Sequence, residues 1–180
     1  MKLLDRLLGN VELDSLTVAS GKKGIAGATH EQVKAVGAVW SYDYRLGIRD
    51  PNRFVLGIGH VPMIWGRGYD LVAVKIAVRK NTGKPILIFN EPDTPSTWGQ
   101  SCIKPDEAAK LYKPLRALIH SVDPTAKLIV GGVYFLDLQW AAAFVAEYKK
   151  LHGLLPIVEG WHVHHYADSK NYHRDVWRRT

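Results

Sequence analysis

The sequence has 180 residues and only one cysteine, Cys102, so no disulfide can form within it. Many secreted enzymes also lack disulfides, so this absence leaves the cellular compartment open. No apolar run reaches the roughly 18 residues that a membrane-spanning helix needs, and we expect no membrane partner. The apolar stretch at the start is interrupted by Asp5 and Arg6, whereas a secretory signal needs an uninterrupted apolar region. We therefore expect no signal peptide in this chain, and an extracellular location requires that the true start lies upstream.

Motifs for nucleic-acid or nucleotide binding are also missing, although the formal net charge is +7. The 24 Lys and Arg residues are scattered over expected helix faces and loops, with a denser group at Arg174, Arg178 and Arg179. Such scatter is typical of a solubilising surface, so we expect no nucleic-acid partner. The segment Gly21-Lys22-Lys23-Gly24 fits neither the dinucleotide fingerprint nor the P-loop, and we expect no cofactor.

What the chain does contain is an alternation of strand and helix patterns. We expect residues 1–20 to form a leader, either disordered or a short N-terminal helix. Each following strand-helix unit is about 25 residues long, which favours parallel strands joined by right-handed crossovers. Thr29 and Gln32 predict a capping box, and Gly83 a helix C-cap. The expected strands are 23–27, 38–44, 53–65, 85–90, 127–132 and 158–166; the expected helices begin at 29 and cover 69–80, 105–120 and 138–151, with a further helix at 173–179.

Two α/β architectures fit this alternation, an open doubly wound sheet and a (β/α)8 barrel of the TIM type. The open sheet usually carries a glycine-rich first turn for a nucleotide, which this chain lacks. A complete barrel typically needs about 250 residues, and six units fill this sequence. We therefore predict that residues 21–180 form an incomplete TIM-type barrel in which strands seven and eight are missing.

The most informative segment is Phe89-Asn90-Glu91-Pro92-Asp93. It follows the apolar run 85–88, so an amide and a carboxylate lie where a buried strand ends. Pro92 cannot donate to a sheet and marks the exit into a loop. In a parallel α/β barrel this end of the strands is where catalytic groups collect. Glu91 can serve there as a proton donor, and Asn90 can hold a substrate hydroxyl.

Asn90-Glu91-Pro92 resembles the signature of a large clan of retaining glycoside hydrolases built on (β/α)8 barrels. His164-His165-Tyr166, at the end of the sixth expected strand, resembles the His-x-Tyr of the clan. The resemblance extends over residues 23–167. Further segments are similar to clan members or to its β-1,3-glucanase-like "glycosyl hydrolase catalytic core" family: Gly131-Gly132-Val133, Trp40-Ser41-Tyr42 and Pro62-Met63-Ile64-Trp65-Gly66.

This resemblance implies a glycosidase that cleaves a β-linked polysaccharide or oligosaccharide with two carboxylates about 5 Å apart. Glu91 takes the acid/base role, and Asn90 hydrogen-bonds the 2-hydroxyl of the sugar. His164 and Tyr166 line the site and position the nucleophile. The clan places that nucleophile, a Glu, at the end of strand seven, and no seventh strand is found before Thr180.

Three other acids, Asp43, Asp93 and Asp168, lie at the expected end of the strands, but none has a motif to recommend it as nucleophile. We therefore predict that the nucleophile lies outside this chain and that the chain alone is inactive. An open barrel also exposes strand edges at 23–27 and 158–166, which favours self-association.

Aromatic residues support a sugar site independently of the motif. Sugar rings present C–H faces that stack on aromatic planes, while polar neighbours take the hydroxyls. We expect substrate contacts from aromatic residues at strand ends or in the following loops, together with His164: Trp40, Tyr42, Trp65, Trp98 and Tyr166.

Other readings stay open. His162 and His164 lie on one strand face, as in metal-dependent hydrolase barrels, and His60 lies near another strand end. The Asn-Glu-Pro context speaks against that reading, so we expect no bound metal. A degenerate barrel that binds carbohydrate without cleaving it would keep the aromatic residues and lose the catalysis. A basic nucleic-acid binder is the third alternative.

Overall fold

The computed structural model describes residues 23–48, 57–134 and 138–164. All strand pairs among them are parallel, and the strands run in the orders β1-β2-β3 and β4-β5-β6-β7. In chain order the elements are β1 (Gly24–Ala26), α2 (His30–Val36), β2 (Trp40–Tyr42), β3 (Gly59–His60), β4 (Met63–Ile64), α4 (Leu71–Lys80), β5 (Pro85–Ile88), a 3-10 helix (Ser96–Trp98), α5 (Pro105–Val122), β6 (Lys127–Tyr134), α6 (Leu138–His152) and β7 (Gly160–His164). The predicted α/β class with a parallel, incomplete TIM-type barrel is confirmed.

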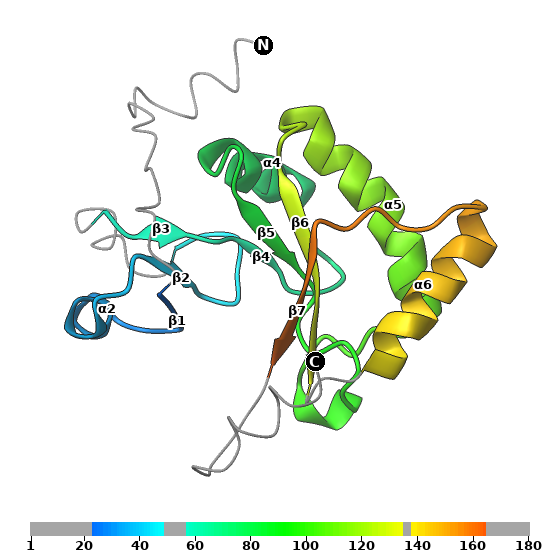
Figure 1. Cartoon of the computed structure of the whole chain (residues 1–180), viewed down its shortest axis with the longest axis horizontal. Helices are drawn as coiled ribbons and strands as arrows, with labels where there is room; N and C mark the ends of the chain where they lie inside the picture. Colours follow the sequence, from blue (N-terminus) through cyan, green and yellow to red (C-terminus); the bar gives the residue numbers. More distant parts are fainter. Residues whose placement is uncertain (1–22, 49–56, 135–137, 165–180) are drawn as a thin grey trace.

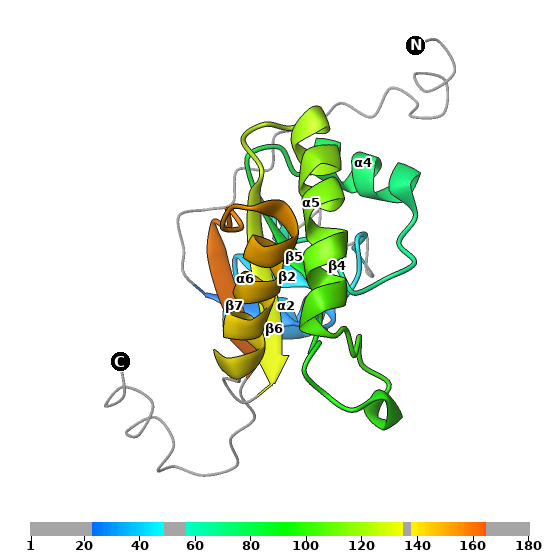
Figure 2. The same ribbon diagram turned by 90° about the vertical axis from the view of Figure 1, so that its right-hand side faces the viewer.

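The helices α4, α5 and α6 cover one side of the strands β4 to β7 (Figure 1). Figure 2, turned by 90°, shows α5 and α6 side by side in front of the sheet. The main core lies between these layers, and successive residues of β5 divide between its two sides. Ile86 and Ile88 are buried in the core, whereas Leu87 lines a cavity on the inner side of the barrel. The inner side is therefore available for polar groups at the strand ends.

The predicted third strand, 53–65, differs most from the structure. Residues 53–56 lie outside the described part, and the rest forms two short strands, β3 and β4, separated by Val61 and Pro62. Pro62 has no N–H to donate, so it interrupts the ladder. Its carbonyl accepts from Leu87 N at 2.9 Å, while Val61 N donates to Ser41 O at 2.8 Å. The chain thus changes its partner from β2 to β5 at this proline.

The helix ends show one prediction confirmed and one wrong. Thr29 and Gln32 form the predicted capping box at the start of α2. Gly83 is not a C-cap, because α4 ends at Lys80 and Asn81 caps it, donating its side-chain amide to Ala77 O at 2.8 Å. Gly83 lies in the following turn with φ of 72°, a conformation that favours glycine.

Some predictions fall outside the described residues, namely the leader 1–20, the helix 173–179, Tyr166 and Asp168. Within the described ranges, no helix combines the length and the apolar character needed to cross a bilayer.

Candidate active site

The exit of β5 has an unusual backbone. Phe89 and Glu91 have φ values of 71° and 44°, in the left-handed region that non-glycine residues rarely occupy. Contacts from two directions hold this geometry: Glu91 N donates to Gly132 O at 2.9 Å, and Thr94 Oγ1 donates to Glu91 O at 2.8 Å. Backbone strain of this kind persists only where the surroundings over-determine it, and it clusters at functional sites.

Two glycines of β6 allow this exit to lie close to the neighbouring strands. Gly131 and Gly132 have φ values of 122° and 62° at a bulge in the pairing with β7. A Cβ on Gly132 would lie 2.7 Å from His162 Cε1 and 3.0 Å from Phe89 O. A Cβ at these distances would force His162 or the backbone of Phe89 to shift, so glycine allows the close approach of β5 and β7 here.

Glu91 and His164 form a buried pair at the carboxyl ends of β5 and β7. His164 Nδ1 and Glu91 Oε1 are 2.9 Å apart, and their side chains are 8% and 4% exposed. The donor in this hydrogen bond depends on the imidazole tautomer and on whether the carboxyl is protonated. Two of the site residues indicated by the sequence, 73 positions apart, are thus in direct contact.

Glu91 lines a hollow of about 270 Å³ together with Tyr44, Trp65, Asn90 and Gln100. Asn90 Nδ2 donates to Gln100 Oε1 at 2.7 Å. Asn90 Oδ1 is buried and has no hydrogen-bond partner among the described residues. An acceptor of this kind beside an open space can bind a hydroxyl donor.

Sequence reasoning missed Tyr44 and Gln100. Tyr44 contacts Tyr42 edge-on, with ring centroids 4.9 Å apart, and it approaches His164 at 6.5 Å. A signal for Tyr44 existed, because Tyr42 and Tyr44 are two residues apart at the end of a predicted strand. Gln100 lies in an irregular loop that has no periodicity, so the sequence held no signal for it.

The predicted aromatic residues do not gather at one place. Trp65 lines the hollow with Glu91, whereas Trp98 is 53% exposed and meets Tyr134 edge-on at 5.3 Å. Trp40 begins β2 rather than ending it, and a Cβ on Gly24 would collide with its ring. The expectation that Trp40 lies at the strand end is therefore wrong, since its indole packs over the first strand.

A second cavity, of about 550 Å³, opens on the inner side of the barrel. Trp40 and Tyr42 line it together with Leu87, His162 and His164. Tyr42 and His164 end their strands and so connect this cavity to the carboxyl end, where Glu91 lies.

His162 lies two residues before His164, and their rings are 5.7 Å apart. Burial, reinforced by the neighbouring His164, lowers the pKa of His162 to about 4. Hydrogen bonds to the backbone of Ile88 and Phe89 act in the opposite direction and are outweighed. His162 is therefore a neutral side chain near pH 7, with its Nε2 buried and without a partner in the described part.

The remaining acids and histidines form neither a second catalytic centre nor a metal site in the described part. Both carboxylate oxygens of Asp93 accept from Tyr134 N, at 3.0 and 2.9 Å, so Asp93 fixes the end of β6. Asp43 is buried but does not line the hollow around Glu91. Among residues 23–48, 57–134 and 138–164, no group of three or more His, Cys, Asp or Glu could hold a metal ion.

Comparison with known proteins agrees with this architecture. The family model described as glycosyl hydrolase catalytic core matches residues 22–177. A crystal structure of a curdlan-specific exo-β-1,3-glucanase of GH128 subgroup III from Blastomyces gilchristii, in complex with glucose, is similar, with a TM-score of 0.67 and 23% sequence identity. The similarity covers 87% of this chain and 66% of that enzyme. At this identity the likeness establishes the fold. No curated protein matched the sequence.

Proposed function

Because this chain belongs to the glycosyl hydrolase catalytic core family, we propose that it carries the acid/base half of a retaining glycosidase. The observation behind the proposal is the buried hydrogen bond between Glu91 and His164 at the carboxyl end of the barrel strands. This end is where barrel enzymes place their chemistry. The adjoining hollow is lined by Asn90, whose buried Oδ1 has no partner among the described residues and can accept from a sugar hydroxyl.

In the proposed mechanism, Glu91 first gives its proton to the leaving oxygen and later, as a carboxylate, takes a proton from the attacking water. His164 holds Oε1 in both states. Its Nδ1–H donates to the ionised carboxylate, and its other tautomer accepts from the protonated carboxyl. Asn90 Oδ1 accepts from a sugar hydroxyl, a contact that strengthens as the transition state forms.

Retention needs a second carboxylate, about 5 Å from Glu91, to attack the anomeric carbon. Of the described residues that line the hollow, Glu91 is the only carboxylate. As part of this proposal we place the nucleophile outside this chain, and we therefore expect the chain alone not to hydrolyse its substrate. We infer a β-1,3-glucan as substrate from the similar enzyme, with Tyr44 and Trp65 as the aromatic faces for the sugar.

Externally supplied azide tests this division of roles. In the whole chain, azide can attack the anomeric carbon of a β-1,3-gluco-oligosaccharide while Glu91 protonates the departing oxygen, which yields an α-glycosyl azide and the shortened alcohol. We expect the oligosaccharide to be cleaved only when azide is present. In Glu91→Gln we expect the rate of azide product formation to fall at least about 100-fold, since general acid catalysis contributes that much. Glu159→Gln is the matched control, because Glu159 binds Arg116 and the Leu128 N–H rather than the hollow.

Each outcome separates the alternatives. Hydrolysis with retention in the absence of azide would show that the nucleophile lies within the chain. If the chain binds the oligosaccharide without forming any azide product, and Glu91→Gln binds it equally well, the result would favour a non-catalytic carbohydrate-binding barrel. The single carboxylate among the described residues of the hollow is also compatible with that alternative. Equal losses in Glu91→Gln and Glu159→Gln would contradict the acid/base role. An absence of binding would exclude β-1,3-glucan as the ligand.

A further inference from the structure

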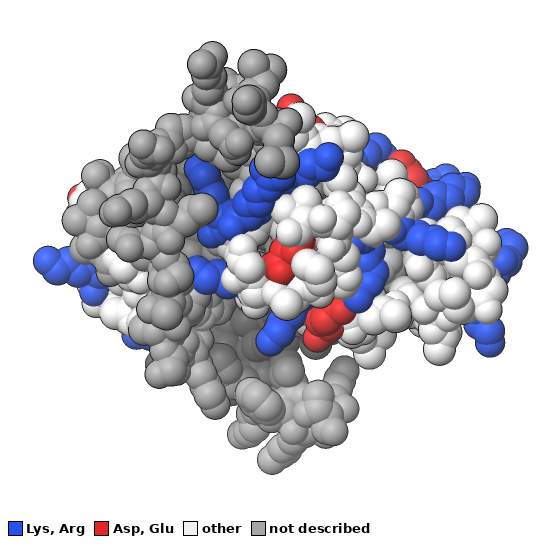
Figure 3. Space-filling model, turned by 90° about the horizontal axis from the view of Figure 1, so that it is seen from above, with Lys and Arg blue, Asp and Glu red and all other residues white. Residues whose placement is uncertain are grey.

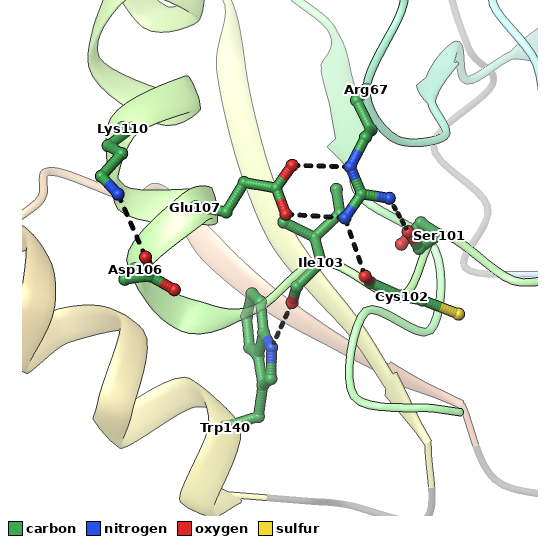
Figure 4. Close-up of polar contacts among 8 residues, drawn as sticks. All are labelled: Arg67, Ser101, Cys102, Ile103, Asp106, Glu107, Lys110 and Trp140. Atoms are coloured by element: carbon green, nitrogen blue, oxygen red, sulfur yellow. Dashed lines mark hydrogen bonds and ion pairs between the residues drawn. The ribbon is translucent and has the colours of Figure 1, made fainter. Parts of the chain in front are cut away.

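Arg67 joins three parts of the chain next to the hollow (Figure 4). Its guanidinium follows β4 and binds both carboxylate oxygens of Glu107, in the first turn of α5, each at 2.6 Å. It also donates to the carbonyl oxygens of Ser101 and Cys102, each at 2.9 Å. A planar guanidinium can make all four contacts at once, whereas a lysine ammonium cannot reproduce this fork.

The loop held in this way has a strained backbone. Cys102 has φ of 47°, a left-handed conformation that is unfavourable for a residue with a Cβ. The next carbonyl, of Ile103, accepts from Trp140 Nε1 of α6 at 2.9 Å. Three consecutive carbonyls therefore bind side chains from outside the loop, and the arrangement over-determines the loop conformation.

This loop reaches the hollow through two contacts with Asn90. Ser101 N donates to Asn90 O at 3.1 Å, and the neighbouring Gln100 accepts from Asn90 Nδ2 at 2.7 Å. The second contact engages the amide nitrogen of Asn90, while its buried Oδ1 has no hydrogen-bond partner among the described residues. The position of Gln100 thus decides which end of the Asn90 amide is available.

We propose that Arg67 is a positioning residue of the Glu91 site, which fixes residues 100–103 so that Gln100 orients the side chain of Asn90. Among the described residues the hydrogen bonds of Arg67 go to Glu107 and to the backbone of Ser101 and Cys102, none of which lines the hollow, so it acts through that backbone. The inference rests on the proposed function for the identity of the ligand, while its structural content is independent of it.

The chain offers a matched control in Arg116. Its guanidinium binds both carboxylate oxygens of Glu159, at 2.9 and 2.7 Å, immediately before β7. This pair is likewise bidentate, with slightly longer hydrogen bonds, and lies at the amino end of the strands, away from the hollow. Arg67→Lys and Arg116→Lys keep the charge and remove the fork in both cases. A difference between them therefore reports position rather than the loss of an ion pair.

The experiment measures β-1,3-gluco-oligosaccharide affinity by calorimetry and amide exchange at Ser101 by NMR. We expect Arg67→Lys to weaken affinity about tenfold and to speed up Ser101 exchange, because the loop then samples other conformations. Arg116→Lys is expected to lower the melting temperature without changing either quantity. Gln100→Ala should weaken affinity, shift the side-chain amide signals of Asn90 and leave Ser101 exchange unchanged.

Equal effects of Arg67→Lys and Arg116→Lys on affinity would overturn the inference, as would unchanged affinity in Gln100→Ala. If the unmodified chain binds no oligosaccharide, β-1,3-glucan is excluded as the ligand, and the NMR measurements alone decide about Arg67. In that case, unchanged Ser101 exchange and Asn90 signals in Arg67→Lys would contradict its positioning role.

Discussion

His162 illustrates how the barrel interior controls the charge of a single residue. Its pKa is lowered from 6.5 to about 4, mainly because burial disfavours the imidazolium. A neutral His162 leaves the adjacent pair of His164 and Glu91 without a further positive charge beside it.

The shift predicts a pH-dependent stability. As pH falls from 7 to 5, the unfolded chain protonates His162 and the folded chain does not, so the folded state loses about 2 kcal/mol from this group. Glu107, Asp123 and Glu159 have lowered pKa values, so the stability that they add is lost at lower pH. We expect His162→Gln to remove this part of the pH dependence in urea unfolding at pH 7 and pH 5. Parallel pH curves for the two proteins would contradict the assignment.

At the scale of elements, the contact between the β5 exit and the β6 bulge controls the geometry of the site. Gly132→Ala would bring a Cβ to 2.7 Å from His162 Cε1 and to 3.0 Å from Phe89 O, in a residue with φ of 62°. We expect a destabilisation of about 3 kcal/mol in chemical unfolding, because overpacking adds to the conformational strain.

The matched control is Gly153→Ala at the end of α6. Gly153 has φ of 73°, and an added Cβ would meet nothing within 4 Å, so this change carries the conformational strain alone. We expect about 1 kcal/mol for it. Equal destabilisation by the two substitutions would show that the close approach of Gly132 to its neighbours has no energetic weight.

The sequence allowed those elements to be predicted whose signals are local. The capping box of Thr29 and Gln32 and the apolar run 85–88 depend on neighbouring residues alone, and both predictions held. Pro62 was included in a predicted strand because the sequence does not show which strands pair on either side of it. In the structure the pairing changes from β2 to β5 at this proline, which interrupts the strand. Gly83 has a positive φ because it lies in the turn after α4, not because it caps the helix. The residue type alone therefore led to a wrong prediction of a C-cap.

The residues of the candidate site also differ in whether the sequence carries a signal for them. The sequence placed Glu91 and His164 at the same end of the barrel, because parallel strands bring their carboxyl ends together. Their direct contact was not predicted, since the resemblance gave His164 a role beside the nucleophile. Gln100 and Arg67 act through an irregular loop, where position follows from tertiary hydrogen bonds rather than from periodicity. Such residues become visible only when the fold is known.

At the scale of the whole molecule, the formal net charge of the sequence is +7. On the face shown in Figure 3, Lys and Arg are interspersed with Asp and Glu. Interspersed charges of both signs on this face are typical of a solvated surface.

The ends of the strand array predict self-association. Among the described residues, β1 pairs only with β2 and β7 only with β6, so both present an edge. Trp161 and Val163 on β7 are each 42% exposed. Unpaired edges with apolar side chains favour association between chains. We expect sedimentation velocity to show an average mass that rises with protein concentration.

Charge on the edge strand tests the origin of this association. Val163→Lys should reduce it, because a charge on an edge strand opposes pairing with another chain. Val72→Lys is the control, since Val72 is 58% exposed on α4, away from the edges. A constant monomer mass in the unmodified chain, or an equal effect of both substitutions, would contradict the prediction.

The two halves of the loop after Glu91 differ in their freedom to evolve. Residues 95–99 are exposed, whereas Ser101 and Ile103 are buried and fixed by Arg67 and Trp140. Mutations, insertions or grafted segments in the exposed half can change the protein surface beside the hollow without disturbing Asn90. Sequence change in residues 95–99 is therefore separated from the contacts that hold Asn90, and a library directed at residues 95–99 should retain folded variants far more often than one directed at 100–103.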